Sequence, residues 1–307
     1  MIGRKGFALV LTLVITALMV AVTAELIHQV YVDTSLSRGF RDGQQASLLA
    51  ESGIEGGKKL LQMALSGQDF SSLSDKWAQP FKLDDETGSI TITAVEENGK
   101  ICLNGLILPN GDYDSFTLET LKRLGSQLKL PVNLWPALAD WLDSDDLVKS
   151  EGAESSYYMT LKSPYRARNG KLATLAELSL VKGFTPEVII KLKPFVTVYA
   201  EKSGSLISKS RININTAPKE VLMALDKGID DRLAARVLEE RRLKPFKSVA
   251  ELSRVSGLET ISTGLQGFAS VKGAVYLVTS VAQVKDTLRT VESVIRLSDE
   301  ILSWQEY

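Results

Sequence analysis

The chain has 307 residues, of which 44% are hydrophobic and 24% are charged, and its formal net charge is −1. At about 150 residues per domain, this length predicts two folded units, and the balanced charge gives no sign of a polyanionic partner. The single cysteine, Cys102, excludes an intramolecular disulfide, and the single histidine, His28, disfavours zinc sites and Ser-His-Asp catalysis.

The N-terminal segment has the composition of a membrane span. Arg4 and Lys5 precede Gly6, and residues 7–24 contain no charged side chain. An apolar run of this length is long enough to cross the hydrocarbon core of a bilayer. Because basic flanking residues favour the cytoplasmic side, the rest of the chain is expected on the outer side of the membrane.

Three interpretations fit this segment. A secretory signal peptide would need a small-residue cleavage site, for which Val22-Thr23-Ala24 is a loose match. A plain membrane anchor requires nothing further. The third interpretation rests on the Gly6-Phe7 step and on apolar residues that continue at helical spacing, which predict one helix over residues 7–65. The glycines within this helix could bend it, namely Gly39, Gly43 and the Gly56-Gly57 pair.

The sequence RKGFALVLTLVITALMV resembles the leader and first helix of type IV prepilins. The resemblance implies that residues 1–6 are a leader, and that a prepilin peptidase cuts between Gly6 and Phe7 and methylates the new N-terminus. Most members of that family place a glutamate five residues into the mature chain, where this chain has Leu11. Its absence is characteristic of the K-type pseudopilins of type II secretion systems. A carboxylate among apolar helices is costly without a neutralising partner, and in the resembled fibres this glutamate meets the N-terminal amine of the subunit above. The resemblance therefore implies that a subunit with Leu11 fits the topmost position of a fibre.

The first predicted strands follow a polar stretch that ends the helix. In residues 88–95, Ile90 and Ile92 alternate with threonines, as in a half-buried strand. Asn98-Gly99 then predicts a hairpin turn that leads to a returning strand over residues 100–108.

The C-terminal region predicts two more strands. Residues 274–284 and 287–297 are β-branched runs separated by Lys285-Asp286. The predicted sheet is therefore split in sequence. Residues 66–109 and 270–307 form an α/β domain, and residues 110–269 are an insertion.

Amphipathic periodicity and capping residues predict that the insertion is helical, with helices at residues 116–130, 134–142, 186–192, 217–225 and 231–242. It contains an internal repeat, because residues 174–184 match residues 248–258 nearly position for position. Each copy opens with a residue that can cap a helix, Thr174 or Ser248, and has Glu177 or Glu251 at the third helical position.

An acidic segment follows the second predicted helix of the insertion. Asp140 and Asp143 share one helix face, and the other carboxylates follow in a loop, namely Asp145, Asp146, Glu151 and Glu154. Carboxylates at a helix C-terminus repel one another and the helix dipole, and a bound Ca²⁺, which takes oxygen ligands alone, would remove both penalties. A solvated acidic loop is the simpler alternative. Paired carboxylates acting as acid and base would need a sugar-binding cleft, for which the sequence gives no other sign.

The same segment resembles K-type pseudopilins. Those proteins share the string D-W-x-D-x-D…G-A-E…Y and bind calcium there, which implies a role for Asp140, Trp141, Asp143, Asp145, Gly152, Ala153, Glu154 and Tyr157 or Tyr158. The continuation through Pro164, Tyr165 and Asn169 is also similar. The implied fold is α+β. In it, a pilin-like N-terminal helix packs on a small antiparallel sheet, and the inserted helical domain contains helix-hairpin-helix or SAM-like repeats.

Residues 211–258 also resemble the helix-hairpin-helix repeats of DNA-binding competence proteins. In that motif, backbone N–H groups of a glycine-containing turn bind a phosphate. Here the turn is Gly228-Ile229-Asp230, with Asp226 and Asp231 beside it, so carboxylates stand where the phosphate would bind. A membrane-anchored DNA-binding protein remains the alternative, because the segment also contains Arg232, Arg236, Arg241, Arg242 and Lys244.

The order of these features identifies the chain as similar to K-type minor pseudopilins along nearly its whole length. The resemblance implies a non-enzymatic subunit at the tip of the pseudopilus that helps to start its assembly. The expected partners are the I- and J-type minor pseudopilins, then the H type, the major pseudopilin, the prepilin peptidase and the inner-membrane assembly platform, with no nucleic acid. The expected location is the inner membrane of a bacterium, with a single span, most of the chain in the periplasm and calcium as cofactor.

Overall fold

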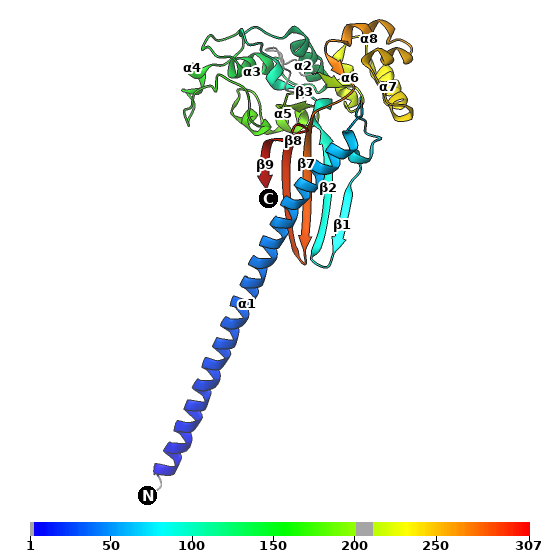
Figure 1. Cartoon of the computed structure of the whole chain (residues 1–307). Helices are drawn as coiled ribbons and strands as arrows, with labels where there is room; N and C mark the ends of the chain where they lie inside the picture. Colours follow the sequence, from blue (N-terminus) through cyan, green and yellow to red (C-terminus); the bar gives the residue numbers. More distant parts are fainter. Residues whose placement is uncertain (1–2, 201–210) are drawn as a thin grey trace.

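The structure, a computed structural model, describes residues 3–200 and 211–307 and the side chains from residue 6 onward. A long helix leads from the N-terminus to a five-stranded sheet, and a helical part sits at the end of the sheet away from the N-terminus (Figure 1). The helical part extends sideways beyond the sheet, so the molecule is widest at this end. The pilin-like α+β fold expected from the sequence is confirmed.

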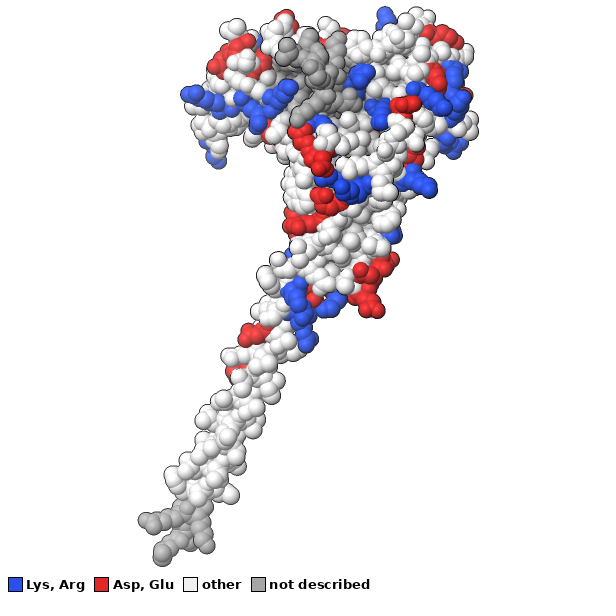
Figure 2. Space-filling view, in the orientation of Figure 1, with Lys and Arg blue, Asp and Glu red and all other residues white. Residues whose placement is uncertain are grey.

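The N-terminal helix α1 spans Gly3–Leu65 as one uninterrupted element, so the glycines within it do not break it. Its first part stands free, with every described side chain from Gly6 to Arg41 exposed. Figure 2 shows that the lower part of this free segment carries no charge. The second part packs on the sheet through residues at helical spacing, namely Ala46, Ala50, Ile54, Leu61 and Leu65.

The sheet joins strands from both sides of the insertion, in the order β1-β2-β7-β8-β9, and every neighbouring pair is antiparallel. Its strands are β1 (Phe81–Asp85), β2 (Gly88–Glu96), β7 (Val275–Val284), β8 (Thr287–Arg296) and β9 (Glu300–Glu306). Lys285-Asp286 forms the predicted turn, since Val284 pairs with Thr287. The split sheet is therefore confirmed for β2, β7 and β8, and β1 and β9 have no counterpart among the predicted strands. The strand predicted over residues 100–108 is wrong, because this segment adds no strand to the sheet.

The predicted hairpin at Asn98-Gly99 is wrong. These residues belong to the 3₁₀ helix η2 (Glu97–Gly99), and β2 pairs with β1 on its other edge instead. The Asn98 side chain is buried and accepts hydrogen bonds from the backbone N–H groups of Ala274 and Val275, both at 2.9 Å. A Cβ on Gly99 would lie 2.8 Å from the Thr216 hydroxyl. This Asn-Gly pair therefore serves tertiary packing, which the local turn statistics cannot register.

The helical part contains the predicted helices with small changes at their ends. They are α2 (Ser115–Gln127), α3 (Leu134–Leu142), α5 (Pro186–Leu192), α6 (Lys219–Leu225) and α7 (Asp231–Leu243). Shorter elements complete it, namely η3 (Leu103–Gly105), α4 (Ser155–Tyr158), η4 (Leu175–Leu180), η5 (Val249–Arg254) and α8 (Glu259–Leu265). The short helix η1 (Lys76–Ala78) instead packs with α1 and the sheet through the buried Trp77. Two short parallel pairs, β3 (Ile101–Cys102) with β4 (Val196–Thr197) and β5 (Ile212–Asn213) with β6 (Ala269–Ser270), tie its segments together.

The two copies of the internal repeat fold alike. Each forms a six-residue 3₁₀ helix, η4 or η5, in place of the predicted α-helix start. The capping prediction is wrong for Thr174 and Ser248, whose side chains make no cap hydrogen bond. Glu177 and Glu251 do reach back, to the backbone N–H of Ala173 at 2.9 Å and of Lys247 at 3.1 Å. The assignment of these copies to a helix-hairpin-helix or SAM-like family stays a prediction.

A buried carboxylate links the sheet to the helical part. Glu96, the last residue of β2, is 3% exposed and accepts hydrogen bonds from four side chains, which come from three separate segments. These are Ser71 (2.6 Å), Asn213 (2.7 Å), Thr216 (3.1 Å) and Tyr276 (3.2 Å). Burial raises the pKa of Glu96 overall, although these hydrogen bonds act in the opposite direction.

The packing of α1 on the sheet gives a prediction for two adjacent glycines. A Cβ on Gly57 would lie 2.8 Å from Val278 Cγ1 and 2.9 Å from Ile92 Cγ2, whereas one on Gly56 would have no neighbour closer than Ile92 Cδ1 at 3.8 Å. Gly57→Ala should lower the free energy of unfolding by about 1 kcal/mol or more, because overpacking outweighs the gain in helix propensity. Gly56→Ala should raise it by up to about 1 kcal/mol. Denaturant unfolding of both variants tests this, and equal shifts would contradict it.

Candidate metal centre

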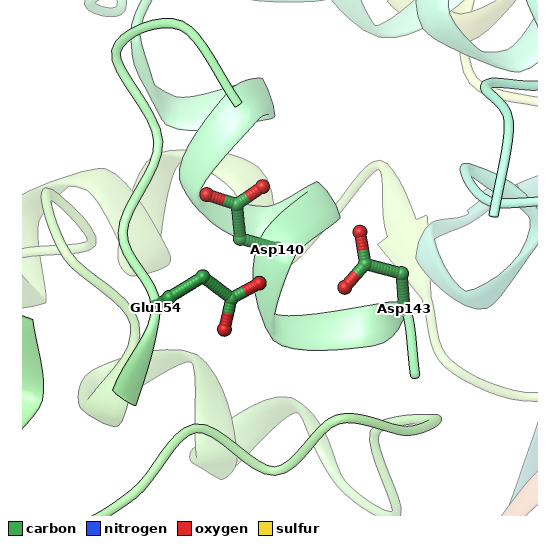
Figure 3. A group of neighbouring side chains, drawn as sticks. All are labelled: Asp140, Asp143 and Glu154. Carbon is green, nitrogen blue, oxygen red and sulfur yellow. The ribbon is translucent and has the colours of Figure 1, made fainter. Parts of the chain in front are cut away.

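Three of the six predicted carboxylate ligands come together at the end of α3. Asp140 lies in the last turn of this helix, Asp143 is its C-terminal cap, and Glu154 lies just before α4. One carboxylate oxygen from each lies within 4.8 Å of the other two. Figure 3 shows the Glu154 side chain extending from its own segment toward the two aspartates.

All three carboxylates are buried, with residue exposures of 0% for Asp140, 3% for Asp143 and 0% for Glu154. Burial, followed by the charges of Asp140 and Asp143, raises the pKa of Glu154 to about 7. Burial also raises the pKa values of Asp140 and Asp143. Such a cluster is unfavourable unless a cation compensates it.

The remaining three predicted ligands lie outside this group. Asp145, Asp146 and Glu151 are exposed, in the loop between α3 and α4. Asp145 accepts a hydrogen bond from the backbone N–H of Leu147 at 2.8 Å, and Asp146 accepts one from Asn169 at 3.1 Å. The periodicity of the sequence correctly paired Asp140 with Asp143, but it could not show which residue of the loop would return to them.

Gly152 permits this return. A Cβ at this position would lie 2.0 Å from Asp140 Oδ2 and 2.9 Å from the Lys149 carbonyl oxygen, so any other residue would push the loop away. The backbone N–H of Gly152 donates to that same carbonyl at 2.8 Å, which closes a turn. The loop therefore brings Glu154 and the aspartates together because residue 152 has no side chain.

An aromatic cluster packs beside the site. The Trp141 ring meets the Tyr158 ring edge-on at 5.2 Å between centroids, and Tyr158 stacks on Tyr165 at 5.2 Å. The Tyr158 hydroxyl accepts a hydrogen bond from the Lys182 backbone at 3.2 Å, and the Lys182 ammonium donates to the Gly152 carbonyl at 3.0 Å. These contacts fix the segments on both sides of Glu154.

Unpartnered acceptors show what the site lacks. Among the described residues, Asp143 Oδ1 and both Glu154 oxygens are buried without a hydrogen-bond donor. The nearest cation is Lys149, whose ammonium bonds Asp143 and lies 3.7 Å from Asp140 Oδ1. One ammonium does not balance three buried carboxyl groups, and a divalent cation would compensate them further. The donor atoms are all oxygens, which fits Ca²⁺. The contact of Lys149 with the carboxylates was not predicted from the sequence.

In the basic segment suspected of binding DNA, Arg236 and Arg241 bond to backbone carbonyls within the protein, whereas Arg232, Arg242 and Lys244 are exposed. Arg241 is buried and donates to the carbonyls of Ile214 (2.8 Å) and Ala217 (2.7 Å), and burial lowers its pKa to about 10. The Gly228 N–H, the predicted phosphate ligand, donates to the Asp226 carboxylate at 2.8 Å. The Asp226 contact disfavours phosphate binding at this turn, and the absence of a nucleic-acid partner stays a prediction.

Comparison with known proteins gives matches over most of the chain. Residues 99–201 and 212–272 match the two family models described as type II secretion system (T2SS), protein K. Type II secretion system protein K of Aeromonas hydrophila is 30% identical over 318 residues, which cover 95% of this chain and 92% of that protein. The protein K of Pseudomonas aeruginosa is 28% identical over 265 residues, or 82% of this chain and 77% of the relative.

A solved structure has the same fold. It is the crystal structure of the GspK-GspI-GspJ complex from the enterotoxigenic Escherichia coli type 2 secretion system. One of its chains superposes with a TM-score of 0.75 and 24% sequence identity, covering 88% of this chain and 99% of that chain.

Proposed function

This chain belongs to the protein K family of type II secretion systems, the K-type minor pseudopilins, and we propose that it occupies the pseudopilus tip and helps to start assembly. The observation that carries the proposal is Leu11 on the free part of α1, where fibre subunits of related families have a glutamate. Among apolar helices such a glutamate needs a neutralising partner, which in related fibres is the N-terminal amine of the subunit above. Leucine carries no charge and needs no such partner. Leu11 therefore gives no charge-based attachment to a subunit above.

The shape of the molecule supports the same position. The helical part lies at the end of the sheet away from the N-terminus and extends beyond it sideways (Figure 1). A subunit inside a fibre has neighbours above it that would meet this wide part. At the tip there is no such neighbour, so the helical part has room there.

The location proposed is the inner membrane, with the bulk of the chain in the periplasm. Among the described residues, one helix is long and apolar enough to cross a membrane. Its most apolar 18-residue window has a mean hydropathy of 2.6 and is wholly exposed. Arg4 and Lys5 precede this window and favour the cytoplasmic side. Cleavage between Gly6 and Phe7 by a prepilin peptidase would leave this helix as the N-terminus of the mature subunit.

The proposed partners are other pseudopilins. The similar solved structure is a complex with GspI and GspJ, which supports I- and J-type minor pseudopilins as direct partners. The family resemblance adds the H-type minor pseudopilin, the major pseudopilin and the inner-membrane assembly platform as further proposed partners. The proposed role is structural, and the carboxylate site described above serves to bind an ion.

Calcium is the proposed ligand of that site. Asp140, Asp143 and Glu154 would supply carboxylate oxygens, and the unpartnered oxygens of Asp143 and Glu154 support this assignment. A divalent ion would give these unpartnered oxygens a cation to bind and would offset the negative charge of the buried carboxylates. The ion would thereby fix the loop between α3 and α4.

Labelling of isolated pseudopili tests the tip position. An epitope placed after Tyr307, which is exposed at the C-terminus, should be found at one end of each labelled fibre. Leu11→Glu supplies a carboxylate for a subunit above and should place some label along the shaft. Leu11→Gln is the matched control, because it adds polarity without charge and should keep the label at the end. Label along the shaft for the unaltered chain would contradict the proposal.

A further inference from the structure

One lysine side chain reaches into the three-carboxylate site. The Lys149 ammonium bonds Asp143, lies 3.7 Å from Asp140 Oδ1, and stands 5.9 Å from the centre of the Tyr113 ring. The backbone N–H of Lys149 donates to both oxygens of Asp140 at 3.2 Å. Residue 149 therefore supplies both a charge and a backbone donor to the carboxylates.

This placement depends on the loop between α3 and α4. Lys149 lies in the middle of an acidic run, and the turn closed by Gly152 brings it back against the end of α3. The neighbouring Lys182 is directed elsewhere, to the Gly152 carbonyl and over the Tyr157 ring. Of these two ammonium groups, only that of Lys149 contacts the carboxylates.

The ammonium satisfies only part of the site. It bonds Asp143 Oδ2, while Asp143 Oδ1 and both oxygens of Glu154 remain buried and unpartnered. An ammonium offers three donors from one compact charge, whereas Ca²⁺ takes six to eight oxygens around it. The two cations therefore need the same oxygens but in different arrangements, and each repels the other at this range.

We propose that Lys149 is a tethered competitor for the cation of this site. Its ammonium occupies the carboxylates when no ion is bound, and it moves off Asp143 when a divalent cation binds. The proposal rests on the proposed calcium site. Its consequence is that the loop keeps a folded path without the ion, while the affinity for the ion is lower than the carboxylates alone would give.

Removal of the charge should strengthen ion binding. Lys149→Met keeps the length of the side chain and should lower the dissociation constant for Ca²⁺ at least about tenfold, because a positive charge beside a divalent ion is lost. Lys149→Arg retains the charge and should bind with nearly unchanged affinity. Lys162→Met, at an exposed position of the same part of the chain, controls for removal of any lysine. The measurement is calorimetric titration of the full chain in detergent with calcium chloride.

A second measurement needs no variant. The Lys149 side chain is 22% exposed when it contacts the carboxylates. Its displacement by the ion should increase its reaction with an amine-labelling reagent, measured by mass spectrometry of the full chain with and without calcium. Lys162 should react equally in both conditions. Protection of Lys149 by calcium, or no change, would show that the ammonium stays in place and would overturn the proposal.

The outcomes separate this proposal from the calcium site itself. If neither the unaltered chain nor Lys149→Met binds calcium, the calcium site is wrong and the competitor with it. If both bind with equal affinity, the site stands and the competitor is wrong. If Lys149→Met binds more weakly, Lys149 supports the ion, which also contradicts competition.

Discussion

Glu96→Ala is expected to lower the free energy of unfolding by about 3 kcal/mol or more, because it leaves a cavity and several buried hydroxyl and amide donors without an acceptor. The side chains of Ser71, Asn213, Thr216 and Tyr276 all donate to this one carboxylate. They come from the loop after α1, from the helical part and from β7. Loss of their shared acceptor should therefore weaken the attachment of the helical part to the sheet.

Denaturant unfolding of the full chain in detergent measures this effect. Trp77 is a suitable fluorescent reporter, because its ring packs edge-on against Tyr276 at 5.2 Å between centroids. Glu86→Ala is the control, since Glu86 is exposed in the turn between β1 and β2 and should change stability by less than about 0.5 kcal/mol. Equal destabilisation by the two variants would show that the Glu96 network contributes nothing.

The same residue gives a pH dependence with a defined sign. Burial raises the pKa of Glu96 above its value in the unfolded chain. Its contribution to stability is therefore fully present below the unfolded pKa and is lost as the pH rises through the folded pKa. Glu96→Gln removes the ionisation, so the stability of this variant should fall less steeply over that pH range. An identical slope in both proteins would contradict the prediction.

Calcium is expected to stabilise the folded chain by about 2.7 kcal/mol at a concentration 100-fold above its dissociation constant. The test is thermal unfolding of the full chain in detergent, with calcium or with chelator. Glu154→Gln should abolish most of the calcium effect, because it removes the buried carboxylate whose two oxygens have no donor. Asp143→Asn should act in the same direction.

The sign of the Glu154→Gln effect should reverse between the two conditions. In chelator, the variant loses a buried charge that repels Asp140 and Asp143, so it should be at least as stable as the unaltered chain. In calcium, it should be less stable. Glu151→Gln is the matched control, because Glu151 is exposed and lies outside the group of three. The assigned ligands would be refuted if chelator left the melting temperature of the unaltered chain unchanged. They would also be refuted if Glu154→Gln and Glu151→Gln lost the calcium effect equally.

The sequence by itself determined the elements with strong local signals. The apolar run and its helical continuation predicted α1, and alternating β-branched residues predicted β2, β7 and β8. The leader predicted to end at Gly6 and the membrane segment that follows it rest on residue type and order alone, so these predictions needed no structure. Asp140 and Asp143 were also paired correctly, because a spacing of three residues puts them on one face of a helix.

Only the tertiary structure decided the features that depend on distant contacts. Asn98-Gly99 has the sequence of a hairpin turn, yet the Asn98 side chain bonds the backbone of β7. Gly99 lies close to Thr216 because it has no side chain. Glu96 acquires its importance from donors 25 to 180 residues away. Glu154 and Lys149 join the aspartates because Gly152 lets the loop lie against Asp140. Local propensity predicts the helices and strands. Burial decides which charged side chains lie close together, and it is known only once the chain has packed.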